Sequence, residues 1–222
     1  MNQYLIYGIG FLAQALFSTR LIVQWIVSER AHKVLSPVLF WQLSLIASFL
    51  LCLYGWLRND FAIILGQIVT YYIYIWNLKA KDSWRKLPKM VRVIFFYLPK
   101  MVIIYFLFHS NDIIQHLFQQ KNIPMGLIIF GVVGQFAFTL RFIYQWFYSL
   151  KAGESLLPLN FWIISLLGSV LIIIYAFIRR DPILLIGQSS GVIVYSRNIM
   201  IGYQAYKEKI MNVQISDSSS SF

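Results

Sequence analysis

Charged residues are scarce in this chain of 222 residues, and acidic residues are the scarcest. Charged side chains make up 12% of the sequence, with 8 acidic residues, 1 cysteine, 6 prolines and 12 glycines. An ordinary soluble enzyme carries about 25% charged residues, so that class is excluded. The single Cys52 excludes a disulfide scaffold, and the low glycine and proline content excludes collagen-like and disordered chains.

Apolar residues, in contrast, make up 59% of the chain, and the mean hydropathy is +0.67. Because one membrane helix takes about 20 apolar residues, we expect an all-α polytopic membrane protein with about six or seven spans. The 19 basic residues lie mostly in short loops beside apolar runs, where they orient helices, and we expect no nucleic-acid partner. The N-terminus lacks a basic segment and a cleavage site, so the first helix is expected to be retained.

The chain contains an internal repeat with an offset of 121 residues. The matches include polar and aromatic residues, which apolar chains rarely align by chance. They are Gln14/Gln135, Phe17/Phe138, Arg20/Arg141, Gln24-Trp25/Gln145-Trp146, Ser28/Ser149, Pro37/Pro158, Phe40-Trp41/Phe161-Trp162, Ser44/Ser165, Ser48/Ser169, Tyr54/Tyr175, Arg58/Arg179, Asp60/Asp181, Gly66-Gln67/Gly187-Gln188, Tyr74/Tyr195 and Asn77/Asn198.

Each copy is predicted to form three helices, over residues 4–27, 38–57 and 61–78 and over residues 124–147, 159–178 and 182–204. The apolar stretch 91–108 between them decides the topology. If it spans the membrane, the copies have the same orientation (3+1+3); if it lies in the interface, they are inverted. Loop charges fit both arrangements. We favour seven spans, with the N-terminus outside and the C-terminus cytoplasmic, because identical motifs indicate one shared face.

The expected domains follow from this layout. Residues 1–79 form the first three-helix repeat, 80–122 a basic linker with a linker helix, 123–207 the second repeat, and 208–222 a disordered tail.

Each of the six repeat helices carries one polar or aromatic stripe at helical spacing, and such stripes converge on a shared interior. The stripes supply the candidate substrate-binding residues, which are Arg20, Gln24, Trp41, Gln67, Tyr74, Asn77, Arg141, Gln145, Trp162, Gln188, Tyr195 and Asn198.

Arg20 and Arg141 are the most informative of these residues. Both lie inside apolar runs, while all eight acids map to loops, termini or the linker. A buried arginine is costly without a counter-ion, and its planar fork fits phosphate or carboxylate. We therefore expect an anionic ligand to be the counter-ion. The alternatives are snorkelling to lipid phosphates and a partner carboxylate from a loop.

The other polar residues have plainer readings. Trp25, Trp41, Trp146 and Trp162 fit an interfacial belt, and the amides could hold helices together. Arg197 lies off the polar stripe and is expected to snorkel. The histidines show no metal spacing, and catalytic motifs are missing, so we expect no metal, no cofactor and no enzymatic activity.

The motifs R-x-x-x-Q-W-x-x-S, P-x-x-F-W-x-x-S, Y-x-x-x-R-x-D, G-Q and Y-x-x-N occur twice, from Arg20 to Asn77 and from Arg141 to Asn198. In this combination the chain resembles the lipid-A-disaccharide synthase N-terminal-like domain family. The copies have diverged, because Ser28-Glu29 becomes Ser149-Leu150, and Tyr195-Ser196-Arg197-Asn198 becomes Tyr74-Ile75-Trp76-Asn77.

The family is similar to the PQ-loop and SWEET transporters, which implies a 3+1+3 fold with Asn77 and Asn198 lining the substrate cavity. The family name comes from fusion to a glycosyltransferase domain, which we expect to be absent here, so its synthase activity is not carried over.

The resemblance and the arginines together lead to a carrier or flippase in the bacterial inner membrane, acting on an anionic lipid-linked sugar or lipid A precursor. A membrane subunit that docks a glycosyltransferase of lipopolysaccharide assembly is the alternative. A carrier of neutral sugars would leave the arginines unexplained.

Overall fold

The computed structural model describes residues 3–57, 61–108, 125–179 and 182–219, and these residues form seven helices. The first repeat contributes α1 (Gln3–Ala31), α2 (Val38–Leu57) and α3 (Phe61–Ala80), and the linker contributes α4 (Lys89–Phe108). The second repeat contributes α6 (Met125–Ala152), α7 (Leu159–Arg179) and α8 (Pro182–Ser219). The expected all-helical class is confirmed.

The ends of the first helices follow the repeat. His32 and Gly153 occupy equivalent positions and both have positive φ, 50° and 74°. Their amides donate to the carbonyl oxygens of Glu29 and Leu150, which ends α1 and α6 in a left-handed residue. Pro37 and Pro158 then precede α2 and α7 by one residue, where the missing N–H is tolerated.

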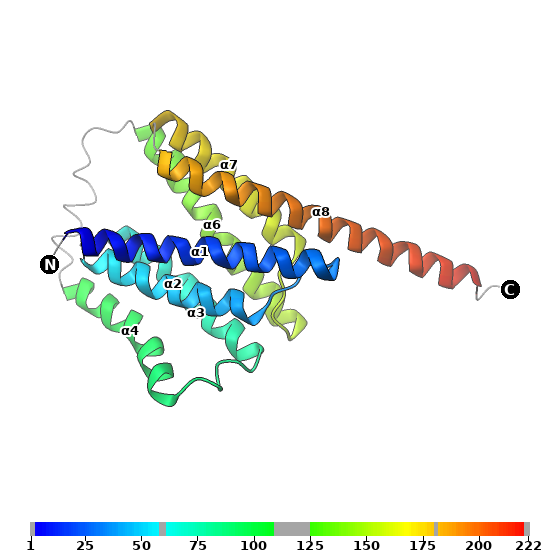
Figure 1. The fold of residues 1–222 in the computed structure, drawn as a ribbon, viewed down its shortest axis with the longest axis horizontal. Helices are drawn as coiled ribbons and strands as arrows, with labels where there is room; N and C mark the ends of the chain where they lie inside the picture. Colours follow the sequence, from blue (N-terminus) through cyan, green and yellow to red (C-terminus); the bar gives the residue numbers. More distant parts are fainter. Residues whose placement is uncertain (1–2, 58–60, 109–124, 180–181, 220–222) are drawn as a thin grey trace.

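α1, α3, α6 and α8 run in one direction, and α2, α4 and α7 run in the other (Figure 1). Within each copy the first helix packs on the second and the second on the third. The two copies meet where α1 packs on α8 and α3 on α6, while α4 packs against α2 and α3.

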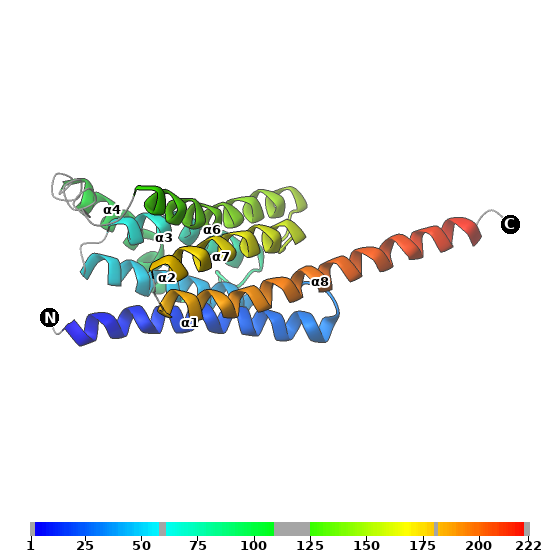
Figure 2. The same ribbon diagram turned by 90° about the horizontal axis from the view of Figure 1, so that it is seen from above.

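Of the described helices, α1, α2 and α7 over Leu159–Ile178 are long and apolar enough to cross a membrane. α8 continues as one helix to Ser219, where the sequence predicted a disordered tail from residue 208. Its C-terminal part projects beyond the bundle (Figures 1 and 2). Tyr203, Tyr206, Lys207 and Glu208 are exposed there.

The core is aromatic and is shared by both copies. Phe40, Trp41, Tyr74, Phe161 and Trp162 are each at most 2% exposed and belong to one buried cluster. The interfacial-belt interpretation is therefore wrong for Trp41 and Trp162, because both indoles lie inside the protein rather than at its lipid-facing surface.

Candidate functional site

Arg20 on α1 contacts both other helices of the first repeat. Its Nη1 donates to Oγ of Ser44 at 2.7 Å and to the hydroxyl oxygen of Tyr74 at 3.2 Å. Its Cζ lies 4.5 Å from the ring centroid of Phe17 and 5.2 Å from that of Phe40. Only 4% of Arg20 is exposed, so the guanidinium is fixed inside the protein and does not snorkel.

Arg141 on α6 has the equivalent environment in the second repeat. Its Nη1 donates to the hydroxyl oxygen of Tyr195 at 3.1 Å. Its Cζ lies 4.2 Å from the ring centroid of Phe138 and 5.5 Å from that of Phe161. Arg141 is 6% exposed. The snorkelling alternative is therefore wrong for this arginine too.

Phe142 brings the two arginines together at the boundary between the copies. The centroid of its ring lies 5.3 Å from Cζ of Arg20 and 4.9 Å from Cζ of Arg141. The same ring packs edge-on against Tyr74 and Phe161. The equivalent residue in the first copy is Leu21. Two cations from different repeats thus share one aromatic ring.

Neither arginine forms an ion pair with another described residue, since Arg197 and Glu29 form the only described pair. Nε of Arg20 and Nε of Arg141 are both buried without an acceptor in the described part of the chain, as are the indole N–H groups of Trp41 and Trp162. An unpaired buried donor costs about 1–3 kcal/mol. Positive charge and free donors together suit an anion that carries several oxygen acceptors.

One helical turn further along α1 and α6, amide side chains join the two copies. Gln24 donates from Nε2 to Oδ1 of Asn198 at 2.8 Å, and Asn198 donates back at 3.1 Å. Gln145 and Asn77 exchange the same two bonds at 2.9 and 3.2 Å. All four side chains are fully buried. In this conformation each amide is held by the other repeat.

Two more contacts join the copies near the same end. Ser36 donates from Oγ to the carbonyl oxygen of Ser155 at 2.6 Å, linking the α1–α2 and α6–α7 loops. Arg197 donates from Nε to Oε2 of Glu29 at 2.9 Å. Arg197 therefore pairs across the repeats, and its expected snorkelling is wrong. We call the part of the molecule containing these four cross-repeat contacts the closed end.

Elsewhere in the described ranges, the polar contacts of the candidate residues stay within one copy. Oε1 of Gln67 accepts from Ser48, and Oε1 of Gln188 accepts from Ser169, at 3.0 and 3.2 Å. These pairs join the second and third helices of each repeat. The structure therefore brings Tyr74 and Tyr195 to the arginines. Trp41 and Trp162 pack on these tyrosines, and Gln67 and Gln188 lie in separate contacts.

Sequence reasoning missed Phe142 and did not include Ser44, which accepts from Arg20, among the candidate residues. Phe142 follows Arg141 directly, but its counterpart in the first copy is Leu21, so Phe142 is not among the residues that match between the repeats. In the described residues, no three His, Cys, Asp or Glu side chains gather as a metal site.

The profile of the lipid A biosynthesis N-terminal domain matches this sequence twice, over residues 9–79 and 130–200. The chain belongs to this family. The two matched segments are separated by the same offset as the repeat, so each copy is one domain of the family.

Curated relatives include lipid-A-disaccharide synthases of chlamydiae. The Chlamydia pneumoniae protein is 29% identical over 207 residues, which cover 90% of this chain and 34% of that protein. The Chlamydia trachomatis serovar D protein is 26% identical over 227 residues, covering 93% and 36%. The chain thus spans about a third of the length of these relatives. No solved structure shows significant similarity to it.

Proposed function

We propose that this protein is a non-catalytic carrier for an anionic lipid-linked sugar or lipid A precursor in the bacterial inner membrane. The observation that carries the proposal is the pair of buried arginines, which share Phe142 and have no carboxylate partner among the described residues. The family and the synthase relatives support a place in lipid A biosynthesis.

The substrate phosphate would lie between Arg20 and Arg141, where Nε of each arginine is an unpaired donor. Sugar hydroxyls would bond to the amides of Gln24, Asn77, Gln145 and Asn198 once those amides separate. Trp41 and Trp162 are the proposed stacking surfaces. The remaining candidates, Gln67, Tyr74, Gln188 and Tyr195, would line the path.

Alternating access is the proposed mechanism, with the two repeats rocking about the arginines. The four cross-repeat contacts support a conformation shut at the closed end, because the described hydrogen bonds between the copies gather there. We further propose a SWEET-like arrangement of seven spans, 3+1+3. The N-terminus would be periplasmic and the closed end and C-terminus cytoplasmic.

The first experiment combines native mass spectrometry with translocation assays of the purified protein in proteoliposomes. The probes are a fluorescent polyprenyl-phosphate hexose and an acylated glucosamine phosphate. Arg20→Gln/Arg141→Gln should lower binding and transport of at least one probe by about 10-fold per arginine, because a hydrogen bond to a charged group contributes about 1.5 kcal/mol or more.

Arg92→Gln is the matched control. Nε of Arg92 is also buried without a described partner, but Arg92 lies on α4, away from Arg20, Arg141 and Phe142. This variant should bind and transport as the wild type does. Wild-type transport of the probes by the double variant would exclude the phosphate role of the arginines.

A second candidate is a membrane subunit that docks or activates a glycosyltransferase of lipopolysaccharide assembly. The observation that favours it is that the synthases contain a region similar to this chain within a polypeptide about three times as long. This function predicts stable co-purification with such an enzyme and no effect of the arginine substitutions on lipid binding.

A further inference from the structure

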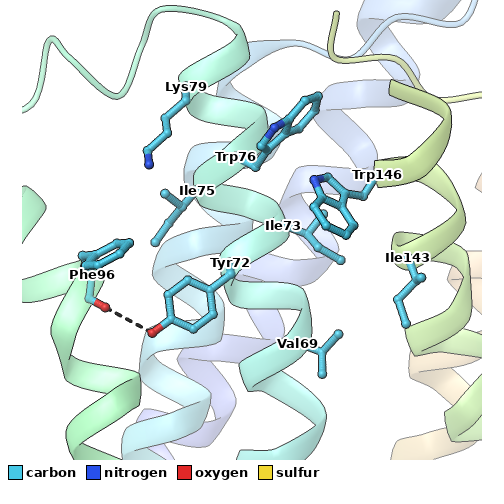
Figure 3. Close-up of a pocket in the computed structure, with 9 residues that line it drawn as sticks. All are labelled: Val69, Tyr72, Ile73, Ile75, Trp76, Lys79, Phe96, Ile143 and Trp146. Carbon is cyan, nitrogen blue, oxygen red and sulfur yellow. Dashed lines mark hydrogen bonds between the residues drawn. The ribbon is translucent and has the colours of Figure 1, made fainter. Parts of the chain in front are cut away.

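A second candidate binding site lies on the face of α3 between α4 and α6. It is separate from the arginine cluster, by which we mean Arg20, Arg141, Phe142, Tyr74 and Tyr195. It is a cavity of about 420 Å³, a volume within the range of small-molecule sites. The cavity shares no residue with the arginine cluster. Figure 3 shows Trp76 and Trp146 on one side and Phe96 on the other; the full lining is Val69, Tyr72, Ile73, Ile75, Trp76, Lys79, Phe96, Ile143 and Trp146.

The lining is apolar except at a few points. The hydroxyl of Tyr72 already donates to the carbonyl oxygen of Phe96 at 3.1 Å, so it is not free for a ligand. Val69 is 40% exposed, and the cavity therefore reaches the surface of the bundle. The volume of the cavity is about that of one turn of an α-helix, so a partner helix is too large to lie in the cavity. A flexible hydrocarbon chain fits this shape and lining.

Positive charge gathers at one edge of the cavity. Nζ of Lys79 lies 5.7 Å from the ring centroid of Phe96, and Nζ of Lys100 lies 4.3 Å from the same centroid. Lys79 comes from α3 and Lys100 from α4. Neither is ion-paired within the described ranges. Two ammonium groups beside an apolar cavity match a ligand with a hydrocarbon chain and an anionic head.

The unpaired indole of Trp146 gives the cavity a further donor. Its Nε1 is buried and has no described acceptor. The equivalent Trp25 in the first copy donates to Oε2 of Glu29 at 3.1 Å, and Glu29 also binds Arg197. In the second copy Leu150 stands in place of Glu29, and Trp76 in place of Arg197. The divergence of the repeats thus replaces an ion pair at one interface by a lined cavity at the other.

We infer that this cavity binds one acyl chain of an anionic membrane phospholipid, whose phosphate contacts Lys79 and Lys100. The N–H of Trp146 would donate to an ester or phosphate oxygen of the same lipid. Since the cavity reaches the surface of the bundle at Val69, the lipid would enter from the surrounding bilayer. The inference stands independently of the carrier function.

Photolabelling of the full chain in nanodiscs tests the inference. The probes are phosphatidylglycerol and phosphatidylcholine that carry the same diazirine at the end of one acyl chain. Phosphatidylglycerol should label residues 69–79 and 143–146 about 25-fold more than phosphatidylcholine, because each of the two lysines near the anionic headgroup contributes a factor of about five. Lys79→Gln should lower that preference about fivefold, because Lys100 remains, whereas Lys151→Gln, which removes an exposed charge at the end of α6, should leave it intact.

A filling variant tests the cavity itself. Ile143→Trp should abolish most of the labelling, while Ile22→Trp, the equivalent position in the first copy, should not change it. Size-exclusion profiles identify any variant that fails to fold, and Lys79→Gln then still decides the question. Equal labelling by both lipids, labelling spread evenly over the apolar surface, or full labelling of a folded Ile143→Trp protein would each overturn the inference.

Discussion

At the scale of single residues, the side-chain amide of Gln145 has several buried hydrogen-bond partners, and no other side chain at this position could satisfy all of them. Its Nε2 has three acceptors within hydrogen-bond distance, which share its two hydrogens: Oδ1 of Asn77 and the carbonyl oxygen of Leu156, both at 2.9 Å, and Oγ of Ser149 at 2.8 Å. Gln145→Leu leaves these groups buried with fewer partners, so we expect it to lower the free energy of unfolding by about 1–3 kcal/mol. Unfolding in mixed detergent micelles, followed by tryptophan fluorescence, measures this loss.

A double-mutant cycle isolates the pair. Gln145→Leu/Asn77→Leu should destabilise by about 1 kcal/mol less than the sum of the single variants, because each single change already breaks the shared bonds. Gln14→Leu is the control, since Gln14 is exposed on α1 and should change stability by less than about 0.5 kcal/mol. Strict additivity of Gln145→Leu and Asn77→Leu would mean that the two amides are not coupled.

Sequence periodicity could place Arg20, Gln24 and Asn198 on polar faces, because spacing along a helix fixes which side each residue occupies. It could not say which helix each face meets. Gln24 bonds to Asn198 of the other copy, whereas Arg20 bonds to Ser44 and Tyr74 of its own copy. These partners depend on how the bundle packs, and no pattern within one helix contains that information.

At the scale of the element, α1 and α6 both end in a residue with left-handed backbone conformation, so their ends can be compared directly. His32 adopts φ 50° with a side chain, while Gly153 adopts φ 74° without one. A Cβ on Gly153 would meet no heavy atom within 4 Å, so any penalty there is one of backbone conformation. The two copies therefore show the same left-handed position once with a side chain, at His32, and once without one, at Gly153.

We expect His32→Gly to raise the free energy of unfolding by about 1 kcal/mol, and Gly153→Ala to lower it by about the same amount. Ala15→Gly, at an exposed position in the middle of α1, should instead destabilise, because glycine weakens a helix interior. Detergent unfolding with far-UV circular dichroism measures all three. A destabilising His32→Gly would mean that contacts of the imidazole outweigh the backbone effect.

Helix positions could be predicted well from the sequence, since apolar runs and the prolines before α2 and α7 set their limits. The last helix was predicted to end at residue 204, whereas α8 extends to Ser219. Its polar continuation beyond residue 207 contains helix-forming residues such as Lys207, Glu208 and Met211, although the low hydropathy of this segment favoured a prediction of disorder.

At the scale of the whole molecule, the copies are similar in fold but not in their two interfaces. α1 meets α8 with the Glu29–Arg197 ion pair, while α3 meets α6 beside the cavity lined by Trp76 and Trp146. The sequence indicated this asymmetry as two departures from the repeat. It did not reveal that the departures face one another, because they come from different copies.

If the repeats rock, holding α1 against α8 at the closed end must stop transport. In a Cys52→Ser background, Glu29→Cys/Arg197→Cys joined by a short bifunctional methanethiosulfonate should show no translocation of the lipid-linked sugar, and cleavage by dithiothreitol should restore it. Tyr144→Cys/Asn160→Cys is the control, because the 2.9 Å contact between these residues joins α6 to α7 within one copy. That cross-link should leave transport unchanged. Wild-type transport by the protein cross-linked between the repeats would rule out rocking at this interface. It would favour the role as a docking subunit, which does not require the two repeats of the chain to separate.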